Sequence, residues 1–317
     1  MKININHSEH IINQILSECN LDAKEIEVFQ SNDRVCDYLV NQSLMLRISE
    51  HTLDEVHKLL RLNVLQGTQR VYGHGCIIHQ KNKINYMLLD FFHGSNLYDT
   101  IPALSTDNAI EIGKDIAKAL KQLHQIKGDQ YDIGHYIPTI PKHRGSWKSG
   151  HQKYISLLHN QIKQVDLSAD DQQTIALAFK YMYHHIDSLN FEEGPVILHN
   201  DLHPKNIIIN QNRYVGMIDW ECSQYGSYDF EFTNLIHWCI YPMDLDRSFE
   251  TLLKSILDHY DHFWTIPMLA ERFTIYQLEH EINQIIWNQG NQIEDRIRRI
   301  NGWLSGLIHQ FFDKIHD

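Results

Sequence analysis

Side chains that could bind a metal ion and activate a hydroxyl gather in residues 199 to 221, HNDLHPKNIIINQNRYVGMIDWE. Asp201 and Asn206 precede an apolar, β-prone run, and Asp219 stands near the end of the next such run. The polar turn NQNR between the runs predicts a β-hairpin, which would bring Asn206 level with Asp219. Pro204 keeps the preceding loop from continuing as a helix. The spacing therefore predicts an amide and a carboxylate side by side, with a second carboxylate close to them.

This set of oxygen atoms matches the chemistry of a magnesium–phosphate site. Magnesium takes one or two carboxylates together with phosphate oxygens, so we expect Asn206 and Asp219 to be its ligands. Asp201 would then be free to orient a hydroxyl and accept its proton. The order H-N-D-L-H-P-K-N resembles the kinase catalytic loop H-R-D-x-x-x-x-N, which is followed by a metal-binding aspartate. A β-hairpin with solvated polar ends is the simpler alternative.

The N-terminal part of the chain must hold the nucleotide if this interpretation is correct. Residues 3–20 have helical spacing, and the short runs EIEVFQ, DYLV and SLMLRIS are strand-like. Residues 51–66 return to a helical pattern, with Thr52 and Glu55 spaced as a capping box. Two further strand-like runs, CIIHQ and INYMLLDFF, follow. The order predicts a small, mostly antiparallel sheet with one main helix.

The remainder of the chain is mainly helical. Apart from the hairpin, we expect helices over residues 106–126, 147–164, 168–190, 228–240, 244–264, 268–288 and 291–316. The predicted fold class is therefore α+β with two lobes. A nucleotide-binding lobe would span residues 1–93, and a helical catalytic and substrate-binding lobe would span residues 94–317, with a hinge near residues 90–95.

Composition narrows the class of protein. Of the 317 residues, 43% are apolar and 21% are charged, which is ordinary for a soluble globular protein. The net charge of -12 disfavours nucleic acid as a partner. Five scattered cysteines without a C-x-x-C motif indicate a reducing compartment, and no run approaches 18 apolar residues. We expect a cytoplasmic protein without a membrane partner.

At residues 199–221 the chain resembles the aminoglycoside phosphotransferases and their relatives, which include choline, homoserine and macrolide kinases. The stretch LHNDLHPKNIII followed by GMIDWE carries the resemblance, and GSYDFEFTNLI resembles the family pattern G-D-P-x-x-D-L-A. The aromatic run after Asp219 is nearest in appearance to hygromycin B and macrolide phosphotransferases. The resemblance implies a protein-kinase-like fold, with ATP or GTP and Mg2+ as cofactors.

The resemblance implies roles for the residues of the catalytic half. Asp201 would be the catalytic base, and Asn206 and Asp219 would bind magnesium. His199 would brace the catalytic loop, and Asp229 would be a buried scaffold residue that holds this loop.

The resemblance also implies a nucleotide site in the N-terminal half. Arg47 and Glu55 would take the place of the lysine–glutamate pair of protein kinases, since a guanidinium can hold phosphate and carboxylate together. An ordinary ion pair is the alternative for these two. Ser31 and Asn32 would lie in a phosphate-binding turn that lacks the usual glycines. Backbone groups of about Asp90, Phe91 and Phe92 would meet the adenine.

The segment between Asp219 and Asp229 is too short to present a peptide, so the acceptor should be a small molecule bearing a hydroxyl. Carboxylates at Glu221, Glu271 and Glu279, with tryptophans near the helical ones, would suit a cationic, sugar-like acceptor. Acidic residues at helical spacing are also typical of a solvated face.

The expected activity is ATP-dependent transfer of a γ-phosphoryl group to a hydroxyl of an aminoglycoside-like antibiotic, an activity associated with antibiotic resistance. Three alternatives stay open at this point. The acceptor could be a housekeeping metabolite such as an amino alcohol, a sugar or a hydroxy amino acid. The protein could bind a nucleotide without turnover, or its 22 histidines could include a zinc site of a hydrolase.

Overall fold

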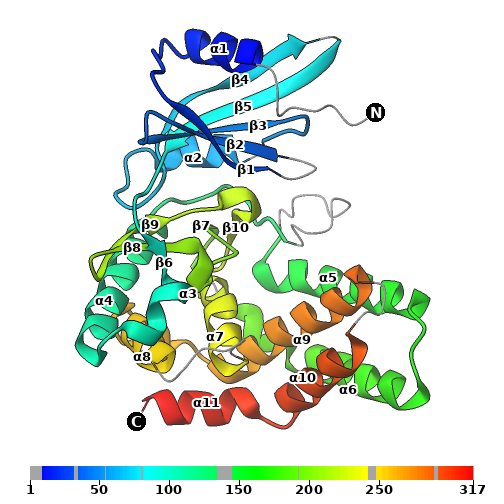
Figure 1. The fold of residues 1–317 in the computed structure, drawn as a ribbon. Coiled ribbons are helices and arrows are strands. Elements are labelled where there is room, and N and C mark those ends of the chain that lie inside the picture. Colours follow the sequence, from blue (N-terminus) through cyan, green and yellow to red (C-terminus); the bar gives the residue numbers. More distant parts are fainter. Residues whose placement is uncertain are drawn as a thin grey trace. The chain divides into compact units, whose positions relative to one another are not determined.

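The chain forms two compact units in the computed structural model (Figure 1). One unit joins residues 1–100 with 204–223, and the other joins residues 101–203 with 224–317. The structure describes residues 9–31, 35–53, 55–79, 81–133, 145–191, 193–241, 248–288 and 292–316. The predicted hairpin thus belongs to the first unit and Asp201 to the second. The expected lobe boundary after residue 93 stays a prediction.

The first unit is built on a five-stranded antiparallel sheet with the strand order β1-β2-β3-β5-β4. Its strands are β1 (Ile26–Ser31), β2 (Val35–Val40), β3 (Leu44–Ser49), β4 (Val71–His79) and β5 (Asn82–Asp90). The helix α1 (Glu9–Glu18) packs its buried residues Ile11, Ile12, Ile15 and Leu16 into the same core as the sheet. This confirms the antiparallel sheet that the order of the strand-like runs predicts.

The main helix of this unit, α2 (Val56–Leu62), follows β3 as expected but begins later than the capping box predicts. Its N-cap is Glu55, which has helical backbone angles and makes no capping hydrogen bond. Thr52 is therefore not the cap. The Glu55 side chain instead lies 3.7 Å from Arg47, and this ion pair competes with the predicted cap for the carboxylate.

The predicted hairpin forms between β8 (Ile207–Asn210) and β9 (Arg213–Met217). Gln211 and Asn212 turn the chain with φ angles of 50° and 59°, as two-residue hairpin turns with positive φ require. A short strand, β6 (Ser95–Asn96), adds to the other edge of β8 and leads into α3 (Leu97–Thr100). A Cβ atom at Gly94 would lie 2.2 Å from the carbonyl oxygen of Ile209, so this approach requires glycine.

The second unit is mainly helical (Figure 1). Its helices are α4 (Thr106–Leu123), α5 (Trp147–Gln161), α6 (Ala169–His185), α7 (Thr233–Ile240), α8 (Ser248–His259), α9 (Leu269–Trp287), α10 (Ile293–Leu304) and α11 (Leu307–His316). Ser105, Ser146 and Ser168 cap the first three of these helices through their side chains. Among the residues described, no helix has the length and apolar character needed to cross a membrane.

Two features of the second unit differ from the sequence-based expectation. The strands β7 (Val196–Leu198) and β10 (Gln224–Gly226) form an antiparallel pair, but three residues each are too few for periodicity to detect. The helix expected over residues 291–316 is two helices, because the chain turns at Gly306 with a φ angle of 87°. The α+β, protein-kinase-like arrangement of sheet and helices is otherwise as predicted.

Candidate active site

The first unit contains a cavity of about 570 Å³, here called the nucleotide cavity. Its apolar lining comes from the sheet, the segment after β5 and the hairpin, and includes Met45, Leu89, Phe91, Phe92, Ile208 and Ile218. Its polar lining includes Asp37, Arg47, Lys205, Asn206 and Asp219. An apolar slot that also carries cationic and oxygen-bearing side chains fits a nucleotide, whose base is apolar and whose phosphates are anionic.

The hairpin brings Asn206 and Asp219 to the nucleotide cavity. Ile207 pairs with Met217, and the next hydrogen bond of the ladder runs from the Ile218 backbone N–H to the Asn206 carbonyl oxygen at 3.0 Å. Asp219 follows directly with a φ angle of 67°, in the left-handed region that non-glycine residues adopt uncommonly. Both side chains line the cavity, and an amide oxygen with a carboxylate is a donor set that fits magnesium.

Arg47 is held mainly by Asp37, which is not among the site residues predicted from the sequence. The two residues face each other across β2 and β3, and Arg47 Nε and Nη2 donate to Asp37 at 3.0 and 3.1 Å. Glu55 lies farther away, at 3.7 Å. Burial lowers the pKa of Arg47, but Asp37 first, and then Asp219 and Glu55, raise it above its ordinary value. Burial raises the pKa of the Glu55 carboxyl, and Arg47 offsets part of that shift.

The remaining residues expected around the nucleotide are placed as follows. Phe91 and Phe92 line the cavity, whereas Ser31, Glu55 and Asp90 are not among its lining residues. The Asp90 carboxylate accepts hydrogen bonds from the Arg70 backbone and the Tyr72 hydroxyl, both at 2.9 Å. Asn32 lies outside the described residues.

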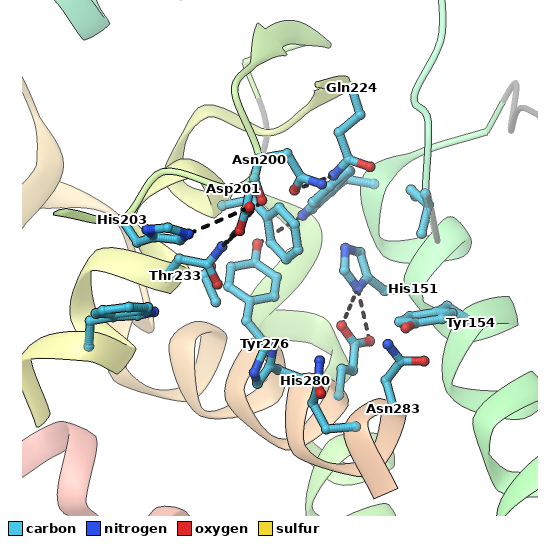
Figure 2. A pocket seen from close by; sticks show the side chains of 17 residues that line it. His151, Tyr154, Asn200, Asp201, His203, Gln224, Thr233, Tyr276, His280 and Asn283 are labelled. Carbon is cyan, nitrogen blue, oxygen red and sulfur yellow. Dashed lines mark hydrogen bonds and ion pairs between the residues drawn. The ribbon is translucent and has the colours of Figure 1, made fainter. Parts of the chain in front are cut away.

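Asp201 lines a separate cavity of about 290 Å³ in the second unit, shown in Figure 2 and here called the acceptor cavity. One carboxylate oxygen accepts a hydrogen bond from Asn234 Nδ2 at 3.2 Å, and the other lies 3.6 Å from His203 Nε2. The His203 ring is itself stacked on Trp238 with 4.7 Å between ring centroids. Asp201 is 30% exposed, so its carboxylate is oriented but still accessible.

The loop that carries Asp201 is held by Glu231. The Glu231 carboxylate accepts hydrogen bonds from the backbone N–H groups of His199, at 2.7 Å, and Asn200, at 3.0 Å. His199 is fully buried, and its Nδ1 atom lies 3.4 Å from the Asp201 backbone nitrogen, in agreement with a bracing role. When the pattern G-D-P-x-x-D is counted from Gly226, its second acid falls on Glu231.

Asp229, the residue that the resemblance gives this role, has other partners. It is fully buried and accepts two hydrogen bonds from Arg272 at 2.9 Å and one from the Tyr276 hydroxyl at 2.9 Å. Arg272 also donates to the Ser188 and Phe191 carbonyl oxygens. Asp229 thus anchors its own 3-10 helix, Tyr228–Phe232, to α9, and Arg272 anchors α9 to the segment before β7. The expected role of Asp229 in holding the catalytic loop is corrected to Glu231.

Of the three acidic residues expected near the acceptor, one lines the acceptor cavity. Glu279 lines the acceptor cavity, and its carboxylate lies 2.8 Å from His151 Nδ1. Glu221 is exposed in the first unit, and Glu271 lies at the start of α9, 4.0 Å from His309. Neither is among the described residues that line the nucleotide cavity or the acceptor cavity. Within the described residues, no group of three or more His, Cys, Asp or Glu side chains could hold a metal ion.

Three solved structures share the fold over nearly the whole chain. The streptomycin–ATP complex of APH(2")-IIa is 18% identical, with a TM-score of 0.62 and coverage of 93% of this chain and 96% of that one. A mutant of APH(4)-Ia with AMP-PNP and hygromycin B is 14% identical, with a TM-score of 0.65 and coverage of 94% and 98%. The GDP complex of an aminoglycoside 2'-phosphotransferase-IIIa mutant is 14% identical, with a TM-score of 0.64 and coverage of 97% and 98%.

The sequence itself matches a family model. No curated protein matches the chain significantly. The model described as "Phosphotransferase enzyme family" matches residues 23–261, which include the sheet, the catalytic loop and the hairpin. Together with the shared fold, this match confirms the expected enzyme class, a small-molecule phosphotransferase of protein-kinase-like fold. The chain belongs to the phosphotransferase enzyme family.

Proposed function

We propose that the enzyme transfers the γ-phosphoryl group of ATP to a hydroxyl of a small molecule, with Mg2+ bound by Asn206 and Asp219. The observation that carries this proposal is the meeting of these two side chains in the nucleotide cavity, in a chain whose preceding loop holds the partly exposed carboxylate of Asp201. Magnesium would neutralise charge on the phosphates when it is bound. The relatives in the solved structures include complexes with ATP, AMP-PNP and GDP, so GTP is the alternative donor.

The nucleotide would be held by the side chains that line its cavity. The apolar residues, Phe91 and Phe92 among them, would enclose the base. Arg47, fixed by Asp37, would present its remaining guanidinium edge to the phosphates, since a planar fork suits phosphate oxygens. Lys205, whose ammonium lies 4.8 Å from the centre of the Tyr98 ring, lines the same cavity and adds a second cation.

Asp201 would act on the acceptor. Its carboxylate would orient the hydroxyl and take its proton as the oxygen attacks the γ-phosphorus. The bond between that phosphorus and the bridging oxygen then breaks, and ADP leaves. Asn234 and His203 hold the carboxylate in one orientation, which reduces the entropy lost on reaching the transition state.

Two classes of compound are candidates for the acceptor. An aminoglycoside-like antibiotic is the first candidate, because the similar structures include complexes with streptomycin and hygromycin B. A housekeeping metabolite such as a sugar or amino alcohol is the second. The second class is favoured because the two carboxylates of the acceptor cavity already have partners: Asp201 contacts Asn234 and His203, and Glu279 contacts His151.

Release of ADP, measured with a panel of hydroxyl compounds, tests the proposal. Asp201→Asn should lower kcat by at least about a hundredfold, since general base catalysis contributes that much, and should leave nucleotide binding unchanged. Thermal shift with ATP and Mg2+ checks binding in the same variant. Near-normal turnover in Asp201→Asn would show that another group is the base. A wild-type protein that binds nucleotide and phosphorylates no compound would favour a binding module without turnover.

A further inference from the structure

The acceptor cavity is rich in aromatic, amide and imidazole side chains and poor in acids. Aromatic residues that line it include Trp147, Tyr154 and Tyr276. Among the described residues that line it, the carboxylates are Asp201 and Glu279. A compound with several ammonium groups needs several acidic partners in such a partly enclosed site, because an unpaired buried charge is costly.

Neither carboxylate is available for such a compound. Asp201 is the proposed base, and Asn234 and His203 already contact it. Both oxygens of Glu279 lie within 2.9 Å of His151 Nδ1, and both side chains are almost completely buried. In Figure 2, dashed lines at His151 mark these two contacts.

Glu281, which follows His280 in α9, already has a cationic partner. It accepts a hydrogen bond from Arg296 at 2.9 Å, and Arg299 donates to His237 at 3.0 Å. These two guanidinium groups also act on His280, which lines the cavity. Burial first, and then Arg296 and Arg299, lower the pKa of His280 to about 4. The surroundings therefore disfavour an additional positive charge on this side of the cavity.

Three polar atoms of the lining have no hydrogen-bond partner among the described residues. They are His151 Nε2, Gln224 Oε1 and Thr233 Oγ1, and their side chains are 1%, 2% and 6% exposed. In Figure 2, His151 turns its Nε2 edge away from Glu279 and toward the side of the cavity where Gln224 lies. Buried polar atoms in native structures are nearly always satisfied, so these three indicate a polar ligand.

We propose that the acceptor is an uncharged polyhydroxyl compound, such as a neutral sugar or polyol, whose hydroxyls bind His151, Gln224 and Thr233. The apolar faces of the compound would pack against the aromatic side chains of the cavity. The inference rests on the proposed function, since it takes Asp201 as the group that contacts the reacting hydroxyl. Glu279 is a positioning residue here, because it keeps a proton on His151 Nδ1 and so fixes the tautomer that faces the ligand.

A panel of substrates distinguishes a neutral polyhydroxyl acceptor from an aminoglycoside acceptor. ADP release would be measured with hexoses, pentoses, linear polyols and nucleosides, and with gentamicin and hygromycin B. We expect the highest kcat/KM with a neutral compound. A higher kcat/KM for gentamicin or hygromycin B than for every neutral compound would overturn the inference while leaving the proposed function intact. If no compound releases ADP and none raises the Tm, the inference fails. If a neutral compound raises the Tm without release of ADP, the proposed function fails instead.

Thr233→Val tests the hydrogen bonds directly. Valine has the shape of threonine, and the lost hydroxyl has no partner within the described protein, so the Tm should not fall. The KM for the best neutral compound should rise about tenfold, which is the effect of losing a ligand hydrogen bond. The KM for ATP should not change. An unchanged KM for the neutral compound would refute the role of Thr233.

Ser188→Ala is the matched control. Ser188 Oγ is also buried without a partner among the described residues, but Ser188 does not line the acceptor cavity. This variant should leave both KM values unchanged. A rise in acceptor KM equal to that of Thr233→Val would mean that loss of any buried hydroxyl has this effect, which would contradict the proposal.

Discussion

Replacing Asp37 by leucine removes the carboxylate that accepts two hydrogen bonds from Arg47, at 3.0 and 3.1 Å. The side chain of Asp37 is 1% exposed and that of Arg47 is 16% exposed, so the guanidinium would lose its main partner in a largely dry setting. Glu55, at 3.7 Å, would be left as a weaker partner. Removing one partner of a buried ion pair lowers the free energy of unfolding by about 3–5 kcal/mol. Because Glu55 remains near Arg47 and the Arg47 side chain is partly exposed, we expect a loss near the lower end, roughly 3 kcal/mol.

A double-mutant cycle isolates this interaction. Asp37→Leu with Arg47→Met removes both charges, so neither is left unpaired. We expect this double variant to be at least about 2 kcal/mol more stable than the sum of the two single losses predicts. Urea unfolding of the full chain measures the four free energies of unfolding. The exposed pair Lys121–Asp261 serves as the control cycle, with an expected coupling below about 1 kcal/mol. Additivity at Asp37 and Arg47 within about 0.5 kcal/mol would refute the reasoning.

Two further predictions concern a buried histidine and the catalytic loop. Burial, and then His280, lower the pKa of His237 to about 4, whereas the unfolded chain binds this proton near pH 6.5. The unfolded state therefore binds more protons between those values, and stability should fall as the pH drops, with His237 alone contributing about 2 kcal/mol of the fall between pH 7 and 5. The urea midpoint should show this slope, and His237→Gln should reduce it; an equal slope in both proteins would contradict the assignment. Glu231→Gln keeps the size of the side chain but removes the charge that accepts the His199 and Asn200 N–H groups, so kcat should fall at least about tenfold with little change in the KM for ATP. Steady-state kinetics measures kcat, with Glu250→Gln as the control. Glu250 is an exposed partner of Lys314, so this control variant should keep a normal kcat. A normal kcat in Glu231→Gln would show that Glu231 does not support catalysis.

Local patterns in the sequence predict most of the fold and the hairpin end of the site. The meeting of Asn206 and Asp219 is predictable because the polar turn NQNR between two apolar runs indicates a hairpin. Asp37 was missed, although residues 37 and 47 lie at equal distances from the turn between β2 and β3 and carry opposite charges. Strand pairing written out residue by residue would have revealed this pair.

The parts that depend on tertiary contacts could not be predicted. Glu231 and Asp229 are two residues apart in a 3-10 helix, and only packing decides which of them meets the catalytic loop. Glu279 and Glu271 share one helix, yet the first is buried against His151 and the second is not. The pairing of His151 with Glu279 spans 128 residues, and no local signal marks it.

We propose that Asn206 and Asp219 together hold the metal ion of the bound nucleotide. A crystal structure of the enzyme with AMP-PNP and Mn2+ tests it most directly, because manganese scatters anomalously and takes the oxygen ligands that magnesium prefers. We expect an anomalous peak about 2.0–2.3 Å from both the Asn206 amide oxygen and an Asp219 carboxylate oxygen. A nucleotide-bound manganese ion that contacts neither residue would contradict it.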